Sequence, residues 1–120
     1  MNLKEIVDEV LNEEAWVDNF DTFRVSVYDN EGNNAHFHLR DKQRNLEACV
    51  RIDEPKFFAH TGKEYRLNAK EKKHLIAFLN QEPRDKLQGI DTNWDFIKWL
   101  WNHNNPDHKI MVAKPDYSKL

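Results

Sequence analysis

The segment Ala35-His36-Phe37-His38-Leu39-Arg40 places two histidines and an arginine at alternate positions. Side chains of a β-strand alternate between its two faces, so His36, His38 and Arg40 share one face and the apolar residues share the other. Imidazole binds metals and exchanges protons near neutral pH, and guanidinium binds anions. This alternation therefore predicts a strand that is buried on one face and carries chemically active groups on the other.

Two more segments, residues 22–29 and 45–53, alternate in the same way and predict neighbouring strands. Loops at 30–32 and 42–45 would join the three strands into an antiparallel meander, and the loop lengths set its register. The expected pairs are Val27–Ala35, Val25–Phe37 and Phe23–Leu39 between the first two strands, and Leu39–Ala48 and Phe37–Val50 between the last two. The Phe37/Val25/Val50 face then lies against the core.

That register groups polar side chains on the outer face of the sheet. The expected rows are Arg24, His38 and Cys49, then Ser26, His36 and Arg51, with Arg40 opposite Glu47. Cross-strand neighbours lie about 5 Å apart, so these groups can act together. Three functions remain open: binding of an anion or a partner, a metal site, and acid–base or nucleophilic catalysis. The expected ligand-binding residues are His36, His38, Arg24, Arg51 and Arg40.

The metal and catalytic hypotheses each lack part of the required set. His36, His38 and Cys49 supply three metal ligands, but two arginines flank the same place and oppose a cation. For catalysis, Ser26 or Cys49 would act beside a histidine, with Glu47 as the nearby acid. Histidines on the outer face of a strand are also often solvated, or covered by a helix. We therefore expect no catalytic residue, no metal and no cofactor.

Helical spacing and capping residues predict three helices. Residues 2–14 form an amphipathic pattern. Asn68 followed by Glu71 is the pattern of a capping box, and that helix runs to about residue 81. In the last helix, residues 92–103, the aromatic and apolar side chains cover more of the helix surface than the single stripe needed to pack on a core. Tryptophan is also frequent at interface hot spots. Core packing accounts for at least half of these rings, and the expected partner-binding residues are Trp99 and Trp101.

Together these elements predict one α+β domain over residues 1–120, with its core at about 2–105 and a C-terminal tail at 106–120. A second hairpin is expected from residues 56–60 and 63–67, which flank Thr61-Gly62. The predicted fold is an antiparallel β-meander plus this hairpin, with an N-terminal helix and two C-terminal helices packed on the sheet.

Composition and charge narrow the class of partner. The formal net charge is −3, which disfavours nucleic acid as a partner. Cys49, the single cysteine, has no internal disulfide partner, which fits a reducing compartment. The N-terminus lacks a secretory pattern, and no apolar run is long enough to span a bilayer. We therefore expect a cytoplasmic protein with no membrane partner.

Five short motifs, taken in order, carry a family resemblance. They are Ala-His-Phe-His-Leu at 35–39, Glu-Ala-Cys-Val-Arg-Ile at 47–52, Leu-Asn-Ala-Lys-Glu at 67–71, Thr-Asn-Trp at 92–94 and Trp-Asn-His-Asn-Asn at 101–105. The chain resembles a group of small uncharacterised bacterial proteins with a His-Phe-His strand. It is distantly similar to a bacterial domain of unknown function with a Pro-Pro-His-Phe-His motif, often encoded beside another small protein in toxin–antitoxin-like pairs. Ala35 stands where proline is common in these proteins. The resemblance implies an α+β fold and a bacterial cytoplasmic origin, and it implies no particular activity.

The patterns favour a small interaction or regulatory module that binds another protein or an anionic ligand through the His/Arg face of the sheet. The alternative is a metal-dependent or histidine-based hydrolase or nuclease that uses His36 and His38. We expect binding rather than catalysis, because the polar rows are present and a complete catalytic set is not.

Overall fold

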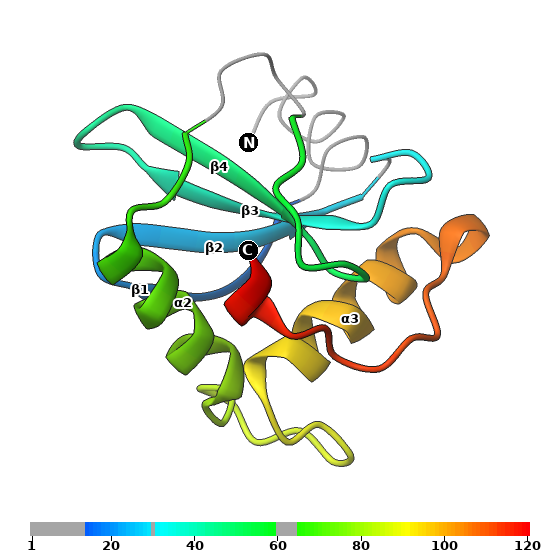
Figure 1. Ribbon diagram of the computed structural model, residues 1–120. Coiled ribbons are helices and arrows are strands. Elements are labelled where there is room, and N and C mark those ends of the chain that lie inside the picture. The colour runs from blue at the N-terminus through cyan, green and yellow to red at the C-terminus, as the bar shows by residue number, and fades with distance from the viewer. Residues whose placement is uncertain (1–13, 30, 60–64) are drawn as a thin grey trace, which may run out of the picture.

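A computed structural model describes residues 14–29, 31–59 and 65–120 (Figure 1). Four antiparallel strands lie side by side in chain order: β1 (Glu14–Phe20), β2 (Phe23–Tyr28), β3 (His36–Asp41) and β4 (Leu46–Arg51). Helices α2 (Ala69–Asn80) and α3 (Asn93–Asn104) cover one face of this sheet, as Figure 1 shows. Two 3-10 turns follow, η1 (Pro106–His108) and η2 (Tyr117–Lys119). The α+β prediction is confirmed.

The core lies between the sheet and the two helices. Val25, Phe37 and Val50, which the alternation places inward, are each 0 % exposed. Ile97 and Trp101 of α3 are also 0 % exposed. Full burial of such a side chain contributes roughly 1.5–3 kcal/mol, so this layer is the main source of stability.

The register between β3 and β4 is the predicted one, with Phe37 opposite Val50 and Leu39 opposite Ala48. The register between β2 and β3 is different. Val25 lies opposite Leu39 rather than opposite Phe37, which is a shift of two residues. A shift of two keeps every apolar side chain on the inner face, so the alternation cannot distinguish the two registers. The loop between β2 and β3 is longer than the three residues expected, and this moves the pairing.

Strand β1 was not predicted, because it does not alternate along its whole length. The register shifts between Trp16 and Asp18, a β-bulge or irregularity that leaves Val17 outside the regular pairing. Beside it, Arg84 donates hydrogen bonds to the carbonyl oxygens of Val17 and Trp16, at 3.0 and 3.4 Å. The helix expected at residues 2–14 falls outside the described residues, except for Glu14, which begins β1.

The described parts of the expected second hairpin are not strands. Residues 56–58 instead run antiparallel along the outer edge of β4. Phe57 forms an isolated bridge with Val50, and the amide of Phe58 donates to the carbonyl of Cys49 at 2.8 Å. The turn of that hairpin lies outside the described residues. Residues 56–58 pair with the edge of β4 because the amides and carbonyls on that edge have no partner strand to hydrogen-bond with.

Helix α2 begins with the predicted capping box. The Asn68 side chain accepts from the Glu71 amide at 2.8 Å, and the Glu71 carboxylate accepts from the Asn68 amide at 3.0 Å. Both bonds satisfy amides that a helix start leaves without partners.

Among the described residues, no helix is long and apolar enough to cross a membrane.

The chain after α3 returns to the core. The indole of Trp101 donates to the carbonyl of His108 at 2.8 Å. Further on, the ring of Tyr117 is 3 % exposed, and its hydroxyl donates to the carbonyls of Arg51 and Ile52 at 2.6 and 3.2 Å. Residues 106–120 therefore close the gap between α2, α3 and the end of β4 (Figure 1).

Candidate functional site

His38 lies at the centre of a buried polar cluster on the face of the sheet away from α2 and α3. Its Nε2 atom is 2.6 Å from Oε1 of Glu31, and its Nδ1 atom is 2.9 Å from Oε1 of Glu47. Sγ of Cys49 is 3.4 Å from the same Nδ1 atom. The ring of Tyr28 stands edge-on to the imidazole, with centroids 4.7 Å apart. Strand β3 supplies the histidine, β4 supplies Glu47 and Cys49, and the loop between β2 and β3 supplies Glu31.

These contacts favour a charged imidazole. Burial opposes the charged form of His38, but hydrogen bonds with Cys49, Glu31 and Glu47 outweigh it and raise its pKa to about 10. Burial also opposes ionisation of Glu31, but hydrogen bonds from His36 and His38 hold the pKa of that carboxyl well below its usual value. The cluster is therefore an imidazolium held between two carboxylates.

The two pKa shifts predict how stability depends on pH. His38 is raised above its usual 6.5, so its contribution is complete below pH 6.5 and is lost as the pH rises towards about 10. Glu31 is lowered from 4.5, so its contribution is complete above pH 4.5 and is lost in acid. We expect the melting temperature, measured in buffer with a chelator, to be highest near pH 4.5–6.5. A melting temperature that rises from pH 7 to 9 would contradict this assignment.

His36 is fully buried beside this cluster. Its Nδ1 atom is 2.6 Å from the carbonyl oxygen of Asn34, and since a carbonyl only accepts, Nδ1 carries a proton. Its Nε2 atom is then directed towards Glu31, whose Oε1 is 3.4 Å away. The rings of Phe58 and Trp101 lie 4.6 and 5.7 Å from the imidazole, measured between centroids. A partner therefore does not reach His36 without displacing these rings.

Cys49, His38 and Glu31 stand in the order of a nucleophile, a base and an orienting carboxylate. Two observations weigh against a catalytic role. Cys49 is 4 % exposed, so a substrate reaches its sulfur only if the chain moves. Glu47 also lies closer than the thiol does to the nitrogen that would take the proton. The arrangement stabilises charge in a buried place.

The exposed part of the candidate site is cationic. The corrected register puts Arg24 opposite Arg40, where the expected row had His38. Glu14 accepts from Arg24 at 2.6 Å and also from the Ser26 hydroxyl. Arg40 and Lys42 are exposed, and neither forms a hydrogen bond or ion pair with any described residue. Like charges placed opposite one another in a sheet repel, so this pair of strands favours an added anion.

Two hollows meet at these cations. One has a volume of about 50 Å³ and is lined by the three cations, by Ser26, Tyr28 and His38, and by the carboxylates of Glu14 and Glu47. The other has a volume of about 330 Å³ and runs over the turns at the ends of β2 and β3. Both are lined by Arg24, Arg40 and Lys42. The smaller hollow holds one small polar group, because a water molecule needs roughly 10–15 Å³ by the same measure.

The other expected site residues lie elsewhere. Arg51 is held by both carboxylate oxygens of Asp53 at 2.9 Å and by Asn34 at 3.0 Å, so its guanidinium is already engaged. Trp101 is 0 % exposed within the core. Trp99 is 48 % exposed and stacks on His103, with centroids 5.1 Å apart. Of the two tryptophans, Trp99 alone presents surface to a partner.

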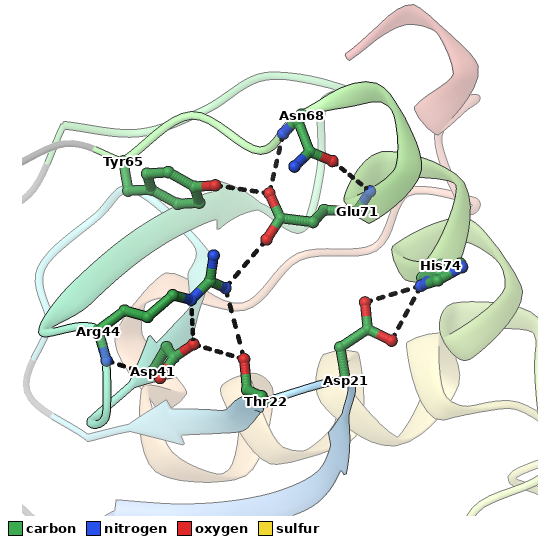
Figure 2. Close-up of polar contacts among 8 residues, drawn as sticks. All are labelled: Asp21, Thr22, Asp41, Arg44, Tyr65, Asn68, Glu71 and His74. Atoms are coloured by element: carbon green, nitrogen blue, oxygen red, sulfur yellow. Dashed lines mark hydrogen bonds and ion pairs between the residues drawn. The ribbon is translucent and has the colours of Figure 1, made fainter.

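A second polar network lies where α2 begins, next to the larger hollow, whose lining includes its Thr22 and Asp41. Figure 2 shows Arg44 reaching Asp41 at 2.6 Å and Glu71 at 3.1 Å, with Tyr65 donating to Glu71 at 2.7 Å. Thr22 donates to Asp41 in the same network. These contacts join the β3–β4 turn to the capping box of α2. The charged groups are engaged with one another, so the network positions α2.

The sequence patterns did not identify Glu14, Glu31 or Lys42 as site residues. Glu14 ends a segment with helical spacing, and the other two lie in loops, where no period shows which way a side chain points. Glu31 is next to Gly32, whose φ of 81° turns the chain at that point. An acidic residue before a turn glycine was the one available signal, and it is weak.

Comparison of the chain with family models, with curated proteins and with solved structures finds no match. The resemblance to bacterial proteins with a His-Phe-His strand therefore stays a prediction.

Proposed function

We propose that this protein is a binding module for a small anionic ligand, which it holds through Arg24, Arg40 and Lys42. The observation that carries the proposal is that two hollows share these three cations, and that neither Arg40 nor Lys42 forms a hydrogen bond or ion pair with a described residue. A guanidinium and an ammonium side by side are a common way to bind phosphate or carboxylate.

Each of the two hollows would hold a different part of the ligand. An oxyanion group in the smaller hollow would contact Arg24, Arg40 and Lys42, whose three positive charges outnumber the two carboxylates, Glu14 and Glu47, in the same lining. The larger hollow takes the rest of the ligand, along Thr22 and Gln43. The charged imidazole contributes to the field in the smaller hollow without direct exposure, since His38 is 6 % exposed. The face thus binds an anion through its arginines and lysine, and the histidines lie behind it.

The test is calorimetric titration of the full chain with inorganic phosphate and with acetate. We expect saturable phosphate binding that weakens about tenfold or more in the double variant Arg40→Gln/Lys42→Gln, because each lost charge-assisted hydrogen bond contributes about 1.5–3 kcal/mol. The double variant Lys70→Gln/Lys73→Gln is the matched control, since it removes two exposed positive charges from α2. It is expected to bind phosphate as tightly as the parent, within about twofold.

Two results would overturn the proposal. One is the absence of saturable binding of either anion to the parent protein. The other is equal weakening in both double variants, which would show a general effect of net charge. Saturable binding of acetate with no binding of phosphate would keep the site and assign it to carboxylates.

A further inference from the structure

The side chains of His36, His38 and Cys49 converge behind the anion site. Each offers one ligand atom, these atoms all lie within 4.8 Å of one another, and all three residues are buried. Imidazole nitrogen and thiolate sulfur are the ligands that Zn²⁺ and related transition metals prefer. In a tetrahedral zinc site such atoms are about 3.3–3.6 Å apart, from the usual Zn–N and Zn–S lengths. Movements of about 1 Å would therefore close the set.

A carboxylate lies beside this set but outside it, on the Nε2 side of the His38 ring, whereas Cys49 lies on the Nδ1 side. Oε1 of Glu31 is 2.6 Å from Nε2 of His38 and 3.4 Å from Nε2 of His36, so it lies near both imidazoles. Zinc sites accept a carboxylate oxygen beside nitrogen and sulfur ligands.

His36 is held in the orientation of a metal ligand. Its Nδ1 atom donates to the carbonyl of Asn34 at 2.6 Å, which leaves Nε2, 3.4 Å from Oε1 of Glu31, as the atom that can bind a metal once it carries no proton. Metal-binding histidines almost always donate their other ring nitrogen to a carbonyl, a carboxylate or a water molecule. The hydrogen bond therefore fixes both the tautomer and the ring direction that binding needs.

The two arginines expected to oppose a metal at this place, Arg24 and Arg51, are each paired with a carboxylate. Arg24 lies opposite Arg40 in the observed register and is paired with Glu14 at 2.6 Å. Arg51 is opposite His36, but its guanidinium is paired with Asp53 at 2.9 Å. In the expected register these two arginines would repel a metal ion. In the observed register their charges are paired with carboxylates, so this argument against a metal site does not apply.

We propose that His36, His38 and Cys49 bind one transition-metal ion of the Zn²⁺ class. These three protein ligands leave the fourth position to a solvent molecule or to the Glu31 carboxylate after a side-chain movement. The bound ion joins β3 to β4. The site does not depend on the anion-binding proposal, because Arg40 and Lys42 take no part in it.

The test uses the full chain after treatment with a chelator, titrated with CoCl₂ and then with ZnCl₂. We expect one equivalent of cobalt to bind with a thiolate-to-cobalt charge-transfer band, which zinc then abolishes. The band is lost in Cys49→Ala, a small substitution that keeps the strand. His36→Gln is expected to weaken zinc binding roughly tenfold or more, and both metals raise the melting temperature of the parent protein. His74→Gln is the matched control, because His74 is half-exposed and paired with Asp21 outside the cluster.

Two results would overturn the assignment. In the first, the chelator-treated protein has a folded circular dichroism spectrum and binds neither metal. In the second, cobalt binds, but the band and the affinity are the same in Cys49→Ala and His36→Gln as in the parent. A phosphate titration of the metal-free protein separates this outcome from failure of the anion site, since Arg40→Gln/Lys42→Gln leaves the metal ligands intact.

Discussion

The variant His38→Leu is expected to lose about 3–5 kcal/mol of its free energy of unfolding, measured by urea denaturation in chelator-containing buffer. The reason is that leucine fills the space but leaves the Glu31 carboxylate, 12 % exposed, without the imidazolium that it contacts at 2.6 Å. Removal of one partner of a buried ion pair costs far more than the pair contributes by its presence. The second carboxylate, Glu47, loses its contact with the same ring.

His74→Leu is the control, because His74 and Asp21 also form a histidine–carboxylate pair, at 2.7 Å, but both side chains are more than one third exposed. That variant is expected to lose about 0–1 kcal/mol. Adding Glu31→Gln to His38→Leu is expected to recover part of the loss, since the carboxylate that has lost the imidazolium is then removed. Equal losses in His38→Leu and His74→Leu would show that burial does not strengthen the His38 pair.

The variant Tyr117→Ala is expected to lose about 3–5 kcal/mol, as large-to-small substitutions of buried aromatic residues do. The ring is 3 % exposed, and its hydroxyl donates to the carbonyls at the end of β4 and in the following residue, Arg51 and Ile52. Tyr117→Phe keeps the ring and removes the donor, so the expected loss is smaller, about 1–2 kcal/mol.

Ser118→Ala is the control for Tyr117, because it is the next residue, is exposed, and among the residues that the structure describes bonds only to Asp116. Its stability is expected to match the parent within about 0.5 kcal/mol. A loss below about 1 kcal/mol in Tyr117→Ala would mean that the last fifteen residues add little to the core. The same urea titration measures all three variants.

Residue patterns predicted the parts of this fold that depend on local chemistry. The period of two located β2, β3 and β4, and the capping box located the start of α2. The short loop between β3 and β4 fixed their register correctly. In these places one local signal was enough, because only one arrangement satisfied it.

The parts that failed depend on contacts between distant residues. A register shift of two leaves the inner face unchanged, so the pairing of Val25 with Leu39 was not determined by alternation. The irregularity at Val17 interrupts the alternation, so β1 was not predicted. Residues 56–58 pair with the edge of β4 instead of forming the expected hairpin. The candidate site follows the same rule. His36, His38 and Cys49 could be grouped from the strands, while Glu31 and Lys42 joined the site from loops.

The two outer strands of the sheet, β1 and β4, each have part of their outer edge covered or interrupted. Residues 56–58 hydrogen-bond along β4, and on β1 the irregularity at Val17 and the guanidinium of Arg84 interrupt the row of carbonyls. An open strand edge is a template on which another chain can extend the sheet, and such pairing begins many aggregates. Arg84 also lies over the ring of Trp16, 4.1 Å from its centroid, which holds it in this position. Residues 56–58 and Arg84 therefore both hinder another chain from pairing with the edges of this sheet. Arg84 lies in a loop and belongs to neither candidate site.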